Sequence, residues 1–288
     1  GLGVQYGAVE DADVEAGALT DAKIALLPYN PDTSAAQEMA LADFLDRGGK
    51  AVACYALPEG LLSRFGLASL EWRRAAEAGE YAAIALDAGV APGVPASIHQ
   101  ASWNARIPAL DGATTLGEWV NADGELSGLP AVTLSDAGAF VGHVLLPVDI
   151  PGKRQFLLAV LSRLAPGSQG ELADAYLARA EAVAGFVDGE AVRTFIQANR
   201  PRLPDRRRYA ALARVTTARK RIEQARASAS KGHYDAAFAA AREGIEAMTE
   251  GLLTGTPSRN DDFRGVWCHS AFGVDGWTWD EALGHLAA

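Results

Sequence analysis

The chain has 288 residues, 49% hydrophobic and 22% charged, and its mean hydropathy of +0.01 is typical of a globular protein long enough for two domains. A chain of this size buries a core without needing disulfides or a structural metal, and it has no apolar run of about 18 residues that would span a membrane. The formal net charge of −10 argues against a general nucleic-acid-binding protein.

The first 166 residues alternate strand-like and helix-like segments. Residues 23–29 are a short apolar run typical of a buried strand, and Thr33 or Ser34 can cap the helix that follows. Residues 51–55 predict the next strand and residues 58–65 a short helix. This order predicts a parallel sheet with helices on its faces.

The middle of this region, from about residue 70 to 130, is richer in glycine and proline. Short strand candidates at 81–86 and 115–120 suggest an antiparallel excursion from the parallel sheet. The chain then returns to a strongly apolar strand at 140–146 and an amphipathic helix at 153–164.

A second region, about 170–255, is helical, with predicted helices at 171–187, 190–199, 209–230 and 234–253. The last two are expected to pair as a hairpin. Residues 201–231 contain ten Lys and Arg residues and two acidic residues, a net charge of +8, so the remainder carries −18. A solvated helix face that pairs with acidic residues explains this charge better than a surface that grips nucleic acid or another acidic partner.

A third region begins near residue 261. Residues 263–270 predict a strand and 279–286 a helix, a unit too small to bury its own apolar faces, so we expect more chain to follow. The segment 263–283, FRGVWCHSAFGVDGWTWDEAL, resembles the start of the catalytic domain in family 10 glycoside hydrolase-like proteins. The resemblance implies that 261–288 open a (β/α)8 barrel whose catalytic carboxylates would come from later strands.

The upstream part resembles the class I glutamine amidotransferase-like domain that precedes such barrels and is similar to the β-galactosidase trimerisation domain. Segments 26–31 (LLPYNP), 44–50 (FLDRGGK), 97–104 (SIHQASWN) and 143–146 (HVLL) carry the resemblance. It implies an α/β fold with a flavodoxin-like open parallel sheet over 1–166, its first strand missing, joined by a helical connector over 167–260.

The resemblance also implies a function and a setting. The chain would be a non-catalytic accessory or assembly region of a glycoside hydrolase acting on an oligo- or polysaccharide, with no cofactor or metal of its own. Homo-oligomers through the α/β domain and an extracytoplasmic bacterial location would accompany that function. Neither nucleic acid nor a membrane is expected as a partner.

Cys54 lies between a strand and a helix, where an amidotransferase holds its nucleophile. The tight elbow of that enzyme normally has flanking glycines, whereas Val52-Ala53 and Tyr55-Ala56 flank this cysteine. The expected His-x-Glu is also absent, since His143 precedes Val-Leu. We therefore expect a buried structural cysteine without a histidine partner. An active thiol-dependent hydrolase using Cys54 is the alternative, and a helical protein-interaction adaptor is a second.

No catalytic residue is assigned, but several residues are candidates for contact with a sugar. His99, Trp103 and Asn104, with Gln100, form a polar and aromatic cluster suited to a sugar ring, but we favour a loop that Trp103 anchors by packing on the sheet or on a neighbouring domain. Trp267 and His269 lie where a barrel would place its active site. Asp149 follows a strand at a carboxyl edge, and capping the helix from Lys153 is its simpler role.

Overall fold

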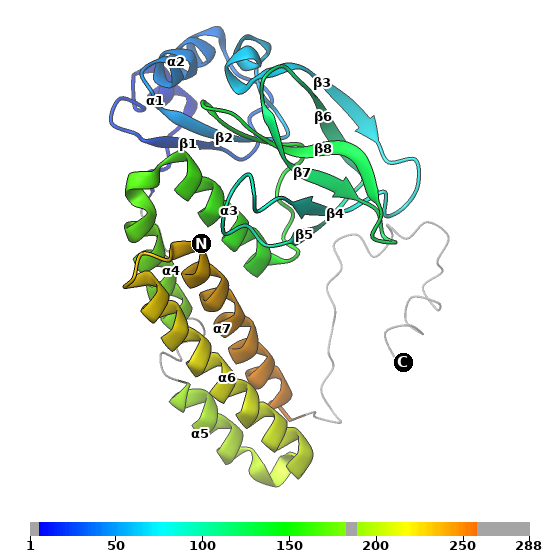
Figure 1. The fold of residues 1–288 in the computed structure, drawn as a ribbon, viewed down its shortest axis with the longest axis vertical. Helices are drawn as coiled ribbons and strands as arrows, with labels where there is room; N and C mark the ends of the chain where they lie inside the picture. Colours follow the sequence, from blue (N-terminus) through cyan, green and yellow to red (C-terminus); the bar gives the residue numbers. More distant parts are fainter. Residues whose placement is uncertain (1–5, 183–188, 258–288) are drawn as a thin grey trace.

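The computed structural model describes residues 6–182 and 189–257 and shows an α/β protein (Figure 1). A seven-stranded sheet has the order β1-β2-β9-β8-β7-β4-β5. The bounds of its strands are β1 Ile24–Leu27, β2 Lys50–Cys54, β4 Tyr81–Leu86, β5 Ser97–Ser102, β7 Thr114–Val120, β8 Leu126–Leu134 and β9 Gly138–Val141. A separate antiparallel ribbon joins β3 (Leu67–Arg74) to β6 (Asn104–Leu110).

The sheet is parallel on one side and antiparallel on the other. Strands β1, β2 and β9 are parallel neighbours, as the strand–helix alternation predicts. From β9 onward each pair is antiparallel, because the segment between β2 and β9 supplies hairpin-connected strands. The antiparallel excursion is confirmed, since 81–86 pairs with 114–120. The sheet is therefore mixed, and the expected flavodoxin-like open parallel sheet is not confirmed; β1 is an edge strand.

The strand predicted over 140–146 is shorter than expected. It ends at Val141, because Gly142 donates its N–H to the carbonyl of Ala131 at 2.7 Å and accepts from the N–H of Arg106 at 2.8 Å. These two bonds tie the end of β9 to β8 and to the β3–β6 ribbon. Beyond these bonds the chain turns at His143 toward the following helix.

Helices cover both faces of the parallel strands. Helix α2 (Ala35–Asp46), capped by Ser34, packs Phe44 on one face with Phe65 and Phe140. Helix α3 (Ile150–Leu164) packs the other face through a core that contains Phe156 and Val52. Other short elements are α1 (Asp11–Glu15) and the 3-10 turns η1 (Glu59–Leu61) and η2 (Ser63–Phe65), the last two replacing the helix predicted over 58–65.

The helical region agrees closely with its predicted boundaries. Its helices are α4 (Gln169–Ala182), α5 (Glu190–Ala198), α6 (Asp205–Ala229) and α7 (Tyr234–Thr254), with short 3-10 turns η3 (Pro166–Ser168) and η5 (Arg200–Arg202). The predicted α6–α7 hairpin is confirmed, and Gly232 at its turn has a φ of 74°. Phe238 and Ile222 share one apolar core with Phe156 below the sheet, whereas Val215 and Met248 belong to a separate cluster with α5.

Four arginines of α6, Arg208, Arg214, Arg221 and Arg226, form ion pairs with acidic residues, as predicted. Arg221 contacts Glu243 of α7 at 2.8 Å, and Arg226 contacts Glu181 of α4 at 2.6 Å. The expected barrel start at 261–288 lies outside the described residues. Among the helices described, none is long and apolar enough to cross a membrane.

Candidate functional site

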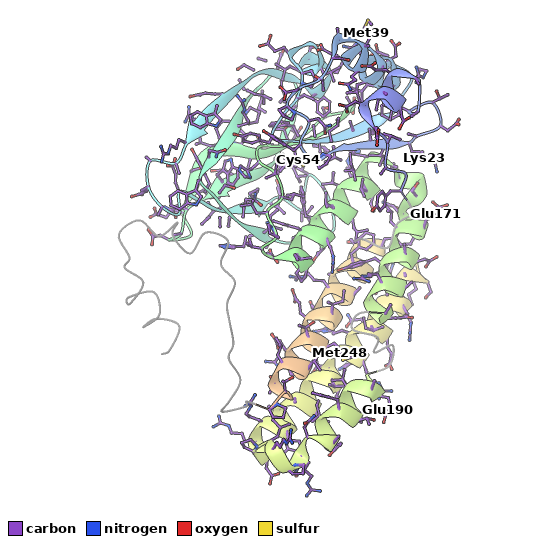
Figure 2. The ribbon with its side chains drawn as sticks, turned by 180° about the vertical axis from the view of Figure 1, so that it is seen from behind. Lys23, Met39, Cys54, Glu171, Glu190 and Met248 are labelled. Carbon is purple, nitrogen blue, oxygen red and sulfur yellow. The ribbon has the colours of Figure 1, made fainter. Side chains whose placement is uncertain are left out.

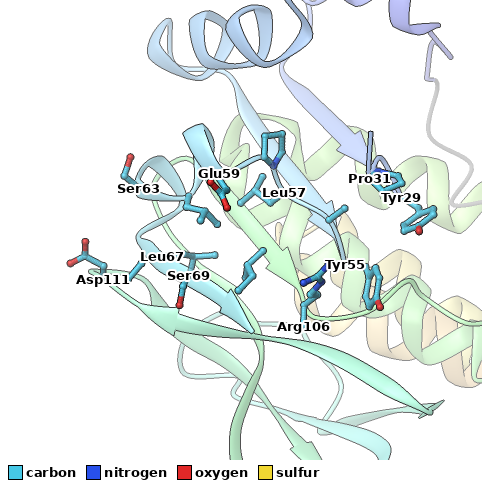
Figure 3. A pocket seen from close by; sticks show the side chains of 15 residues that line it. Tyr29, Pro31, Tyr55, Leu57, Glu59, Ser63, Leu67, Ser69, Arg106 and Asp111 are labelled. Atoms are coloured by element: carbon cyan, nitrogen blue, oxygen red, sulfur yellow. The ribbon is translucent and has the colours of Figure 1, made fainter. Parts of the chain in front are cut away.

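A cleft of about 770 Å³ opens at the carboxyl ends of β1 and β2 (Figure 3). Tyr29 and Pro31 follow β1, Tyr55 follows β2, and the η1–η2 turns and the β3–β6 ribbon close the other sides. Open α/β sheets bind ligands at this edge, because the loops that leave parallel strands diverge there. The volume lies within the range of small-molecule sites.

Tyr55 stands at the centre of the aromatic wall of this cleft. It has a φ of 65°, which is uncommon for a residue with a side chain, and it comes directly after the last residue of β2. Its ring centroid lies 5.9 Å from that of Tyr29 and 5.2 Å from that of His143, the latter in an edge contact. The hydroxyl accepts a hydrogen bond from Nε1 of Trp72 at 3.0 Å. The turn therefore fixes the ring among partners from three other segments of the chain.

Arg106 supplies the positive charge of the cleft. It is half-buried on β6, and its Cζ lies 5.6 Å from the centroid of the Tyr55 ring, within the range of a cation–π contact. Among the described residues no carboxylate forms an ion pair with it, and its guanidinium makes no hydrogen bond. Glu59 and Asp111 also line the cleft, and Figure 3 shows Asp111 at the end away from Tyr55 and Arg106.

His143 supports the wall from behind. Its Nδ1 lies 2.9 Å from the carbonyl oxygen of Val144, which can only accept, so the proton is assigned to Nδ1 and Nε2 carries a lone pair. Burial lowers the pKa of His143, and the nearby Lys153 acts in the same direction. Gln100 donates through Nε2 to the same carbonyl at 2.5 Å. The imidazole is therefore expected to be neutral at pH 7.

Cys54, the residue before Tyr55, lies in the α/β part of the chain (Figure 2) and is not among the residues that line the cleft. It is 6% exposed, and burial raises the pKa of its thiol to about 12. In the described part of the chain the thiol makes no hydrogen bond to a histidine, so the expectation of a buried cysteine without a histidine partner is confirmed. At neutral pH the thiol is protonated, a poor state for nucleophilic attack. The histidine that follows β9 contacts Tyr55 instead.

The predicted polar and aromatic cluster is only partly brought together. His99 and Gln100 point to opposite faces of β5, because side chains alternate along a strand. Nε2 of Gln100 lies 3.3 Å from Nδ1 of His143, and both nitrogens donate to the carbonyl of Val144. The backbone N–H of His99 instead donates to Asp149 at 3.0 Å.

Asn104 begins β6, the ribbon strand that also carries Arg106, and Trp103 directly precedes it, but neither residue lines the cleft. Trp103 is 55% exposed, and the side-chain oxygen of Asn104 is buried with no partner among the described residues. Contact of His99, Trp103 or Asn104 with a sugar stays a prediction. Trp267 and His269 lie outside the described residues.

Asp149 has the capping role expected of it. It adopts a φ of 50° and accepts a hydrogen bond from the N–H of Gly152 at 3.1 Å at the start of α3. Lys153, one turn into the helix, is 5% exposed and donates to the carbonyl of Leu146 at 2.8 Å. Burial lowers its pKa to about 8, partly opposed by Asp149. Among the described residues no group of three His, Cys, Asp or Glu side chains is placed to hold a metal ion.

Sequence reasoning missed the residues that build the cleft. Tyr29 and Tyr55 were placed at the ends of predicted strands, and the position of two tyrosines after two adjacent parallel strands was the available signal. Arg106 and Trp72 lie in a ribbon that was not predicted, so nothing in the sequence indicated that they meet Tyr55.

Comparison with known proteins adds little to this geometry. No family model matches the chain, and no curated protein matches it. A solved structure, α-L-fucosidase isoenzyme 2 from Paenibacillus thiaminolyticus, superposes with a TM-score of 0.36 at 18% identity, covering 49% of this chain and 25% of the fucosidase. The chain thus matches about a quarter of that protein's length. A similarity this weak carries no argument about fold or function.

Proposed function

We propose that the chain is a carbohydrate-binding accessory region, without catalytic residues of its own, in a glycoside hydrolase-like protein that acts on an oligo- or polysaccharide. The proposal keeps the predicted division into an amidotransferase-like domain (1–166), a helical connector (167–260) and a barrel start (261–288). The motifs quoted above for family 10 glycoside hydrolase-like proteins support the assignment to a glycoside hydrolase-like protein. The cleft supports the carbohydrate-binding role.

The observation that carries the proposal is the aromatic wall at the open edge of the sheet. Tyr29 is 52% exposed beside Tyr55, so its ring offers an apolar face to a ligand in the cleft. Sugar rings have apolar C–H faces that pack on aromatic rings, and their hydroxyls need hydrogen-bonding groups around the rim. Glu59, Ser63 and Asp111 provide such groups on the lining of the same cleft.

The burial and raised pKa of Cys54 argue against the rival function, a thiol-dependent hydrolase. An accessory binding role needs neither an activated nucleophile nor a second catalytic carboxylate. The cleft holds its ligand through shape, stacking and hydrogen bonds, and catalysis would belong to another part of the protein.

The test is calorimetric titration of the whole chain with a panel of neutral and acidic disaccharides. Tyr29→Ala removes the ring of the cleft that is 52% exposed, and Tyr209→Ala removes a ring on α6 that lies outside the cleft and is 63% exposed. Tyr29→Ala is expected to weaken binding by about fivefold, since a stacked aromatic contributes on the order of 1 kcal/mol. Tyr209→Ala should leave the Kd unchanged. Binding that survives Tyr29→Ala unchanged, or no binding across the panel, would contradict the proposal.

A further inference from the structure

The positive charge of Arg106 favours an anionic ligand in the cleft over a neutral sugar. It is the one basic residue among the described residues that line the cleft, and it is half-buried. A guanidinium has five N–H donors and no acceptor, and here none of the five has a protein acceptor among the described residues. A charged group in this position is compensated best by an anion that enters from the cleft.

The hydroxyl of Tyr55 adds a second donor close to Arg106. Because Nε1 of Trp72 donates to this oxygen at 3.0 Å, one of its lone pairs is occupied and its own O–H remains available to donate. The Arg106 guanidinium lies over the ring of the same tyrosine. Two kinds of donor thus converge at one end of the cleft, a combination that suits the two oxygens of a carboxylate.

The opposite end of the cleft has the reverse character. Figure 3 shows Asp111 and Ser63 there, with Glu59 between them and the aromatic wall. Carboxylates accept hydrogen bonds from hydroxyl groups and repel a second anion. The net charge of −10 also disfavours a polyanion. The cleft is therefore matched to a ligand with one carboxylate at one end and hydroxyls at the other.

We propose that the cleft selects an acidic carbohydrate, a short saccharide carrying a single uronic acid whose carboxylate binds Arg106 and the Tyr55 hydroxyl. This inference rests on the proposed carbohydrate-binding function and names its ligand class. The remaining hydroxyls face Glu59, Ser63 and Asp111, and the ring packs beside Tyr29. A neutral saccharide of the same shape keeps the ring contact but leaves Arg106 without an acceptor.

The experiment compares matched pairs that differ only at the carboxylate. Cellobiouronate is titrated against cellobiose, and disaccharides that carry one α-1,4-linked galacturonate or one β-1,4-linked mannuronate are each titrated against their carboxyl-reduced forms. The acid of at least one pair is expected to bind about tenfold more tightly or better, the value of one charge-assisted hydrogen bond. Arg106→Gln should abolish this preference, and Arg106→Lys should retain part of it because the charge remains.

Arg47→Gln, at an exposed position at the end of α2, is the matched charge control and should leave the preference intact. Circular dichroism and thermal melting confirm that the variants are folded. If each acid and its reduced form bind equally, through Tyr29, the acidic ligand is ruled out while the proposed carbohydrate binding stands. If neither member of any pair binds, both proposals fall. A preference for acids that survives Arg106→Gln would also overturn the role given to Arg106.

Discussion

The arginines of the α6–α7 hairpin and Arg106 of the cleft occupy opposite electrostatic settings. On the hairpin Arg221 and Arg214 each contact a glutamate of α7, at 2.8 and 3.1 Å. Arg106 lies over an aromatic ring, and no carboxylate among the described residues pairs with it. The first arrangement is complete within the fold and needs no ligand. The second leaves the charge of Arg106 without a partner among the described residues, and this difference is the reason that we propose the cleft as the binding site.

The largest expected effect on the cleft itself comes from breaking the backbone that forms it. A methyl group added at Gly138 of β9 would lie 1.8 Å from the carbonyl oxygen of Ala51 in β2. Gly138→Ala should therefore separate the strands that carry Tyr55 and His143 and lower the free energy of unfolding by about 3 kcal/mol. Urea denaturation measures the loss of stability, and the calorimetric titration measures the accompanying loss of ligand binding.

Gly232→Ala at the hairpin turn is the matched control. Its added methyl would meet no atom within 4 Å, so only the φ of 74° is strained, at a cost of about 1 kcal/mol. Ligand binding should be unaffected. Equal effects of the two substitutions on stability and binding would show that the cleft does not depend on the β2–β9 pairing.

A second prediction concerns Lys153, a buried cation near the cleft. Its pKa is lowered to about 8 in the folded state, chiefly by burial, from 10.5. Below about pH 8 both states are protonated and the burial cost is constant. Between pH 8 and 10.5 the unfolded chain still binds this proton and the folded chain does not, so rising pH favours folding.

The stability of the wild type relative to Lys153→Met should therefore increase across that window by about 1.4 kcal/mol per pH unit. The difference between the two proteins isolates this group from the tyrosines and Cys54, which also titrate at high pH. Urea denaturation at a series of pH values measures it. A difference that stays flat from pH 8 to 10.5 would show that Lys153 is charged in the fold.

The smallest expected effect is a coupling energy, which distinguishes an arginine that is paired with a carboxylate from one that is not. A double-mutant cycle on Arg221 and Glu243 should give a coupling energy of about 0.5 kcal/mol, because both side chains are about 40% exposed. The same cycle on Arg106 and Asp111 should give a coupling within error of zero. A larger coupling would mean that Asp111 already compensates the charge of Arg106 without a ligand.

Local sequence patterns predicted the parts of the fold that local interactions determine. The four helices from α4 to α7 and the strands β1, β2, β4 and β7 lie close to their predicted residues, since their apolar patterns define them. The mixed sheet was not predicted as such, because strand order depends on pairings between distant segments. The β3–β6 ribbon was missed altogether, since Leu67–Arg74 alternates imperfectly and has exposed apolar residues such as Trp72.

The candidate site was less accessible to sequence reasoning than the fold. The cysteine motif correctly points to the end of β2, but the residue that lines the cleft there is the next one, Tyr55, because the backbone turns at this position. His143 was examined as a partner for the thiol and instead contacts that tyrosine. The partnership with Arg106 depends on the hydrogen bond between its N–H and Gly142, which only the assembled structure reveals.

The most direct test of the account follows the side-chain Nε–H signals of the arginines by nitrogen-15 NMR during titration with the tightest-binding disaccharide. The signal of Arg106, assigned by its absence in Arg106→Gln, is expected to shift progressively with ligand, because the cleft places it against the bound sugar. The signals of Arg214 and Arg221 should stay in place, since glutamates already occupy them. A ligand that binds without moving the Arg106 signal, or that shifts the hairpin arginines instead, would contradict the assignment of the cleft as the binding site.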